Sequence, residues 1–188
     1  AGRLGMLNLP GLSLRELYGV SFCEPFLPTD EYLADRQKEK ADIPYTDVWN
    51  IIHRGSYPEL CANPDFDWQM FYAAYVRTYI ERDVRDMARD VGVSQPTAER
   101  WLSILAASNL IVLLTPFHNN ITKRTVKTPK LYFMDTGLAA YLTRWNTPEV
   151  LKNGAMAGAF FETFVIDEII KSYTNKGILD LPLYFYRD

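Results

Sequence analysis

The order of predicted helices and strands between residues 87 and 135 constrains the fold of this chain more than any other sequence feature. A short helix ends at Gly92, and Ser94 then provides the N-cap of a second helix that reaches about residue 107. The strands that follow are predicted at 111–114, 122–126 and 130–134. Two helices joined by a turn and followed by a strand–turn–strand wing are the pattern of a winged helix-turn-helix.

Helical periodicity dominates the rest of the chain. Apolar residues recur at spacings of three and four, and Ser13 with Glu16 forms a capping box that opens a further short helix. These helices are predicted at 31–40, 46–53, 68–88 and 158–172. A strand-like run at 181–186 comes last. The predicted fold class is α+β, mainly helical, with a winged helix-turn-helix and an incomplete α/β nuclease-like domain.

The composition is that of an ordinary globular protein, and it narrows the classes of partner. The 188 residues carry a formal net charge of −3, so nucleic-acid binding would depend on a local basic patch. Two distant cysteines, Cys23 and Cys61, fit reduced thiols better than a disulfide framework or a zinc site. No apolar run is long enough to span a bilayer and no signal peptide opens the chain, so we expect a cytoplasmic protein without membrane contact.

Two groups of residues are candidates for duplex DNA contact. The second helix of the winged-helix unit presents Gln95, Thr97 and Arg100, whose side chains can reach base edges or phosphates. The wing is more basic, and its candidates for phosphate contact are Lys123, Arg124 and Lys127. Two alternatives stay open, namely a solvated hairpin and a winged helix that serves as a protein-binding lid.

The sequence contains no complete catalytic motif. A phosphate loop of the form GxxxxGK[ST] is missing, and His53 and His118 are isolated from other potential ligands. The run Leu131–Asp135 superficially resembles a strand that ends in a magnesium-binding carboxylate, but Asp135 is better explained as a helix N-cap. We therefore assign no catalytic residue.

Glu162 is the single candidate metal ligand. It lies early in the helix predicted at 158–172, and the strand-like run 181–186 follows. Nucleases of the restriction-endonuclease type place a helix glutamate before metal-binding carboxylates on strands. The alternative is a surface glutamate in a first helical turn, where the helix dipole favours an acidic side chain.

Several of these segments together resemble a widespread prokaryotic family of AAA-type ATPases. The resemblance is carried by Arg82-Asp83-Val84, Asp90–Thr97, Trp101-Leu102, Pro129–Leu138 and Phe161–Val165. Proteins of this family pair an N-terminal ATP-binding domain with a C-terminal region that has winged-helix and restriction-endonuclease-like parts. The chain departs from the pattern in lacking the phosphate loop and a longer helical stretch before Asp90, and the nuclease-like part should continue past Asp188.

The resemblance implies that this chain is the C-terminal half of such an ATPase. Residues 1–60 would be the tail of the ATPase domain and a linker, 65–135 the winged-helix module, and 136–188 the start of the nuclease-like domain. The parent protein would use ATP and magnesium, with Arg3 sensing nucleotide, whereas this chain itself would hold no cofactor. A regulatory, DNA-associated module is the expected function. The alternatives are a protein-interaction scaffold, which could be oligomeric, and part of a metal-dependent nuclease.

Overall fold

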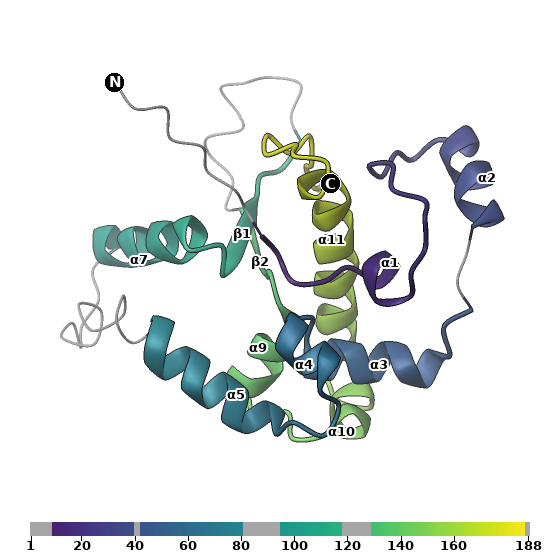
Figure 1. The fold of residues 1–188 in the computed structure, drawn as a ribbon. Helices are drawn as coiled ribbons and strands as arrows, with labels where there is room; N and C mark the ends of the chain where they lie inside the picture. Colours follow the sequence, from purple (N-terminus) through teal and green to yellow (C-terminus); the bar gives the residue numbers. More distant parts are fainter. Residues whose placement is uncertain (1–8, 40–41, 81–94, 118–128, 187–188) are drawn as a thin grey trace, which may run out of the picture.

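The computed structural model describes residues 9–39, 42–80, 95–117 and 129–186 of the chain. Within these ranges the protein is α+β and mainly helical, as the sequence predicted. Figure 1 shows the long C-terminal helix α11 running beside a two-stranded sheet, with α3, α4, α5, α9 and α10 gathered toward one end of it. The helices have the bounds α1 Leu14–Leu17, α2 Asp30–Lys38, α3 Tyr45–Arg54, α4 Pro58–Ala62, α5 Trp68–Tyr75, α7 Gln95–Ala107, α9 Thr136–Leu142, α10 Pro148–Lys152 and α11 Ala157–Thr174.

The sheet consists of two antiparallel strands, β1 (Ile111–Leu114) and β2 (Lys130–Phe133). Ile111 pairs with Phe133 and Leu114 with Lys130, so the two strands are aligned along their whole length. Helix α7 leads directly into β1, and α11 packs against β2. The predicted strand 122–126 lies outside the described residues. At 181–186 the expected strand is reduced to one parallel bridge between Pro116 and Phe185.

Local capping signals in the sequence set several helix starts. The Ser13 backbone N–H donates to Glu16 Oε2 at 2.8 Å, which confirms the predicted capping box. Thr29 caps α2 through Tyr32 N–H, and Asp135 caps α9 through Leu138 N–H at 2.7 Å. The interpretation of Asp135 as an N-cap is therefore confirmed.

The prediction of one continuous α-helix over 68–88 was wrong within the described part. The α-helix α5 ends at Tyr75, and a π-helical turn, η1 (Val76–Ile80), follows it. A π-turn inserts an extra residue and shifts the direction of later side chains, which a period of 3.6 residues in the sequence cannot reveal. Residues 81–88 lie outside the described ranges.

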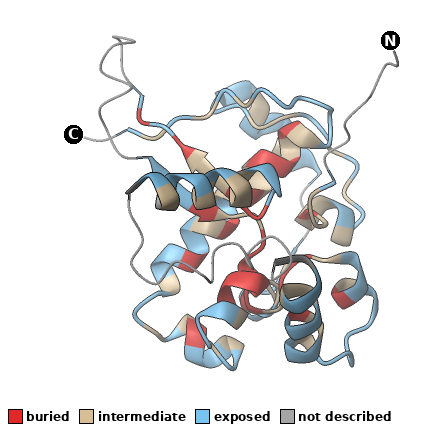
Figure 2. Cartoon of the chain, turned by 90° about the vertical axis from the view of Figure 1, so that its left-hand side faces the viewer, coloured by how far each residue is buried: buried red, intermediate tan, exposed pale blue. Residues whose placement is uncertain are grey.

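Two hydrophobic clusters form the core, and each joins distant parts of the sequence. One cluster packs Trp49 and Ile52 of α3 against Ala140 of α9 and Phe160 and Phe164 of α11. The other is built from Leu60, Tyr72, Leu110, Ile111 and Leu138, with Leu102, Leu105 and Ala106 of α7 packed on its edge. Figure 2 shows the buried residues where these elements meet, whereas α7 and α2 are exposed or half-buried along their described lengths. The buried residues of the first cluster therefore join the predicted segments 1–60 and 136–188, and those of the second join all three predicted segments.

Candidate functional site: a buried ionic junction beside a pocket

The predicted nucleic-acid residues fall mostly outside the described side chains. Arg100 is exposed on α7 and Thr97 is half-buried there, while the side chain of Gln95 is not among those described. Lys123, Arg124 and Lys127 of the wing lie outside the described residues, as does Arg3. The structure thus shows an exposed face of α7 with one guanidinium on it, and DNA contact stays a prediction.

Glu162 lies on the side of α11 that faces strand β2, and its side chain is half-exposed there. Its carboxylate accepts a hydrogen bond from Tyr132 Oη at 2.6 Å and forms an ion pair with Lys130 Nζ at 3.0 Å. The hydrogen bond from Tyr132 and then the one from Lys130 lower the pKa of Glu162. Within the described part of the chain, no group of three or more His, Cys, Asp or Glu side chains could hold a metal ion. A role for Glu162 as metal ligand stays a prediction.

A buried polar network around Asp135 was not expected from the sequence. Besides capping α9, Asp135 accepts a hydrogen bond from Tyr72 Oη at 2.6 Å and from Ser56 N–H at 2.8 Å. Ser56 Oγ donates to the same carboxylate at 3.2 Å. Asp135 is 5% exposed and Ser56 6% exposed. One carboxylate therefore joins the end of α3, the middle of α5 and the start of α9.

Two glycines allow these elements to approach so closely. Gly55 has φ +85°, in the left-handed region, and a Cβ there would collide with Tyr72 Oη and would lie 2.6 Å from Asp135 Oδ1. A Cβ on Gly137 would collide with Tyr72 Oη and would lie 2.5 Å from the Arg54 carbonyl oxygen. The turn that begins at Gly55 ends α3 and also creates space for the Asp135 network.

Helix α11 adds a buried lysine to the same network. Lys171 is 1% exposed, and its ammonium group contacts Asp167 Oδ2 at 2.8 Å and donates to Ser56 Oγ at 3.0 Å. It also donates to the Leu12 carbonyl at 3.2 Å and lies 3.4 Å from Glu168 Oε1. Together these groups form what we call the ionic junction: Ser56, Asp135, Asp167, Glu168 and Lys171.

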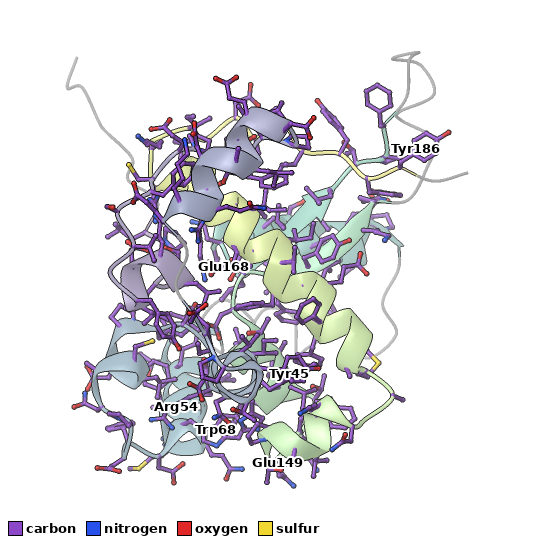
Figure 3. The ribbon with its side chains drawn as sticks, turned by 90° about the vertical axis from the view of Figure 1, so that its right-hand side faces the viewer. Tyr45, Arg54, Trp68, Glu149, Glu168 and Tyr186 are labelled. Atoms are coloured by element: carbon purple, nitrogen blue, oxygen red, sulfur yellow. The ribbon has the colours of Figure 1, made fainter. Side chains whose placement is uncertain are left out.

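The ionic junction also holds the N-terminal segment against α11. Glu168 Oε2 accepts a hydrogen bond from the Leu14 backbone N–H at 2.9 Å, next to the Leu12 carbonyl that Lys171 contacts. Figure 3 shows Glu168 on the side of α11 that faces α1. The start of the described chain is thus bound to its last helix by two charged side chains.

In the ionic junction, burial and the neighbouring charges shift each pKa in opposite directions. Burial raises the pKa of Asp167 to about 7 although Lys171 opposes this, and it raises the pKa of Glu168 as well. For Lys171, burial lowers the pKa, but the carboxylates of Asp167 and Glu168 outweigh it and the net shift is upward. Lys171 is therefore charged at neutral pH. Asp167 Oδ1 is buried without a hydrogen-bond partner among the described residues, so this carboxylate is incompletely compensated.

The contact between Ser56 and Lys171 invites comparison with serine–lysine hydrolases. In those enzymes a neutral lysine takes the proton of the serine hydroxyl. Here the upward pKa shift keeps Lys171 protonated, and its ammonium group donates to Ser56 Oγ. Ser56 in turn donates to Asp135. The arrangement holds elements together and does not activate a nucleophile.

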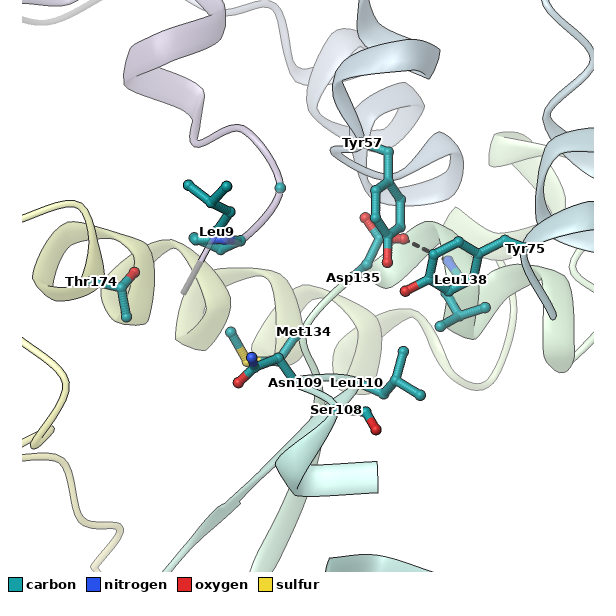
Figure 4. A pocket seen from close by; sticks show the side chains of 12 residues that line it. Leu9, Tyr57, Tyr75, Ser108, Asn109, Leu110, Met134, Asp135, Leu138 and Thr174 are labelled. Atoms are coloured by element: carbon teal, nitrogen blue, oxygen red, sulfur yellow. Dashed lines mark hydrogen bonds between the residues drawn. The ribbon is translucent and has the colours of Figure 1, made fainter. Parts of the chain in front are cut away.

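A pocket of about 210 Å³ lies beside the junction, at Asp135. Figure 4 shows Tyr57 and Tyr75 on one side of it, with Leu9, Asn109 and Met134 also lining it. Burial raises the pKa of the Tyr57 hydroxyl, and the neighbouring Asp135 adds to the shift, so the phenol stays neutral. Asp135 already accepts four hydrogen bonds from the protein itself, so its carboxylate is occupied.

The helical stripe of α11 contains the signal by which the junction could have been found. Phe160, Phe164, Asp167 and Lys171 recur at spacings of four, three and four, and all four are buried. An aspartate and a lysine that continue an apolar stripe at i and i+4 indicate a buried ion pair. Their partners Ser56 and Asp135 are too distant in sequence for any local pattern to show the contact.

The remaining polar candidates have structural roles. His53 is buried, with Nε2 2.8 Å from the Trp145 carbonyl oxygen and its ring 4.4 Å from that of Trp68, which fits a packing residue. Cys23 and Cys61 are both free thiols. In the described ranges, every helix is too short or too polar to cross a bilayer.

Comparison with known proteins yields relatives without an assigned function. A family model described as a domain of unknown function, DUF8612, matches residues 84–149. Uncharacterized proteins of Mycobacterium tuberculosis and Mycobacterium bovis are each 25% identical to the chain over 216 residues. The chain is covered completely but spans 42% of each relative, and the alignment is longer than its 188 residues. The relatives therefore contain residues without a counterpart here. No solved structure matches the chain significantly.

Proposed function

We propose that this chain is a C-terminal regulatory module of an AAA-type ATPase, which transmits ATP-driven movement to a surface that contacts DNA. The observation that carries the proposal is the ionic junction. Lys171 and Glu168 hold the backbone at Leu12 and Leu14, in the segment that would be the tail of the ATPase domain and a linker. A displacement of that segment acts directly on α11, and through it on the sheet that α11 covers.

The described part of the winged-helix unit supports the DNA-facing half of the proposal. Helix α7 and the antiparallel pair of β1 and β2 follow one another in the order that a recognition helix and wing require. Helix α7 packs on the core through Leu102, Leu105 and Ala106. Arg100 is exposed on the same helix, where a phosphate or a base edge can reach its guanidinium.

The test is ATP hydrolysis by the full-length parent protein, with and without duplex DNA, at low and moderate salt. We expect DNA to stimulate hydrolysis, and we expect charge reversal of Lys123, Arg124 and Lys127 to remove the stimulation and flatten its salt dependence. The matched control reverses three described basic residues that are not part of the predicted wing, Lys38, Arg77 and Arg144. A rate of ATP hydrolysis that is the same with and without DNA would overturn the DNA-facing half of the proposal.

A protein-interaction scaffold is the second candidate, and a specific observation favours it. The outer side of α11 and its N-cap expose Met156, Phe161 and Val165, with 46%, 44% and 40% of their surfaces accessible. Neighbouring apolar side chains on an exposed helix are typical of protein contacts. A scaffold predicts a stable oligomer or complex that survives the wing reversal and is lost when Phe161 and Val165 are replaced by serine.

A further inference from the structure

A second pocket lies on the opposite side of α11 from the sheet, between α1, α2 and the segment that joins them. It has a volume of about 350 Å³, and all the residues that line it are described. We call it the Arg15 pocket; its main lining residues are Arg15, Phe22, Phe26, Tyr32, Arg36 and Phe164. The volume suits a small molecule, since pockets for such ligands start at roughly 300 Å³.

The walls of the Arg15 pocket are aromatic and preorganised. The rings of Phe22 and Phe26 each meet the ring of Tyr32 edge to face, at centroid distances of 5.3 and 5.5 Å. Two hydrogen bonds fix the segment that carries Phe26: its N–H donates to Ser172 Oγ, and its carbonyl accepts from Tyr173 Oη. A flat aromatic body fits such walls, because aromatic rings gain additional energy from edge-to-face and offset contacts.

A buried hydrogen-bond donor without an acceptor distinguishes this pocket from an ordinary surface groove. Arg15 Nη1 is buried and has no hydrogen-bond partner among the described residues. Arg36 also lines the pocket, with its guanidinium 5.7 Å from the centre of the Phe22 ring. A buried guanidinium donor without an acceptor is costly, and a bidentate carboxylate is the group that its geometry matches.

The carboxylates in the pocket wall are already engaged. Glu24 pairs with Lys176 at 3.3 Å, while Glu168 pairs with Lys171 and accepts from the Leu14 N–H. Neither forms an ion pair with Arg15 in the described structure, but both lower the positive potential of the site. A singly charged anion is therefore favoured over a phosphate, whose second charge these carboxylates would repel.

We propose that the Arg15 pocket binds a small aromatic monocarboxylate, with the carboxylate on Arg15 and the ring against the wall formed by Phe22, Phe26 and Tyr32. Binding provides an acceptor for the unsatisfied donor of Arg15 and covers the half-buried aromatic wall. The pocket is separate from the DNA-facing surface and from the pocket at Asp135, so this binding does not depend on the proposed ATPase role.

The test uses 2-naphthoate as the probe, with the neutral isostere 2-naphthamide and the dianion 2-naphthyl phosphate as comparisons. Isothermal titration calorimetry gives the dissociation constants, and NMR side-chain signals of Phe22, Phe26 and Tyr32 locate the ligand. We expect 2-naphthoate to bind about ten-fold or more tightly than 2-naphthamide, because a charge-assisted hydrogen bond is lost in the amide. We expect the phosphate to bind more weakly than the carboxylate.

Variants then assign the charge to Arg15. Arg15→Met keeps the apolar stem and should weaken 2-naphthoate about ten-fold or more while leaving 2-naphthamide unchanged. Arg36→Met should weaken 2-naphthoate binding less than Arg15→Met does, and Arg100→Met on α7 should leave this binding unchanged. Equal binding of the acid and the amide, tighter binding of the phosphate, or shifts away from the three aromatic rings would overturn the proposal. If Arg15→Met does not fold, the dissociation constants of 2-naphthoate and 2-naphthamide for the wild-type protein still test the proposal.

Discussion

Helix α11 and strand β2 are joined by an ion pair that can be compared directly with one inside α11 itself. Lys171 and Asp167 lie 2.8 Å apart and are 1% and 3% exposed, whereas Lys130 and Glu162 lie 3.0 Å apart and are each 50% exposed. The distances are nearly equal, so any difference in energy comes from the surroundings. Water screens the outer pair and can replace either partner, while the buried pair has no substitute for a missing charge.

The comparison also separates the two kinds of role that a charged residue can have. Glu162 is accessible, so a ligand or a partner can reach it. Lys171 is enclosed by protein groups from three distant segments and can act only on how those segments are held. The candidate site that sequence motifs favoured is thus the exposed one, and the residues that organise the fold are the buried ones.

The largest expected effect is loss of the buried lysine. Lys171→Met leaves the buried Asp167 and the half-buried Glu168 without their cation, so we expect the free energy of unfolding to fall by about 3–5 kcal/mol. The matched change at the exposed pair, Lys130→Met, should lower it by no more than about 1 kcal/mol. Urea denaturation of both variants measures the difference. Equal effects would show that burial does not distinguish the two pairs.

Gly55→Ala tests the packing around Asp135 without removing any charge. The new Cβ would meet Tyr72 Oη and Asp135 in a left-handed backbone conformation, and we expect a loss of about 2–4 kcal/mol. Gly19 is the matched control, since it also has a positive φ, +63°, but a Cβ added there would meet nothing within 4 Å among the described residues. Gly19→Ala should therefore cost about 1 kcal/mol from backbone strain alone. Similar thermal denaturation midpoints for the two variants would contradict close packing at Gly55.

The helix caps and the ionic junction show which contacts the sequence could predict and which it could not. The caps at Ser13 and Asp135 were predictable because the two partners of each capping hydrogen bond are three residues apart. The contact between Ser56 and Lys171 spans 115 residues, and no local period encodes it. Sequence patterns therefore predicted most of the helices and both described strands, and they predicted Asp135 as a cap but not as the centre of a buried network.

The pH dependence of stability sharpens the comparison further. Asp167 has a pKa of about 7 in the folded protein and an ordinary value of about 3.9 in an unfolded chain. Between these values the folded state binds more protons, so the free energy of unfolding should fall as pH rises from about 4 to about 7. The stabilisation is complete below about pH 4 and is lost above about pH 7.

Asp167→Asn should remove most of this slope, which for one proton cannot exceed about 1.4 kcal/mol per pH unit. Urea denaturation between about pH 5 and pH 8 measures it in the variant and in the wild type. A residual slope from Glu168, whose pKa burial also raises, is expected in both. Parallel pH profiles for the two proteins would exclude Asp167 as the titrating group.

Glu162→Gln should have the smallest effect on stability and is the sharpest test of function. The amide keeps an acceptor for Tyr132 Oη and loses only a half-exposed ion pair, so we expect a change within about 0.5 kcal/mol. Glu31→Gln on α2 serves as the exposed control. If the parent protein cleaves DNA with magnesium through this residue, cleavage falls sharply in Glu162→Gln at unchanged stability and stays normal in Glu31→Gln. A loss of more than about 2 kcal/mol without a change in cleavage would instead make Glu162 a structural partner of Tyr132, and the contrast between the two ion pairs of α11 would disappear.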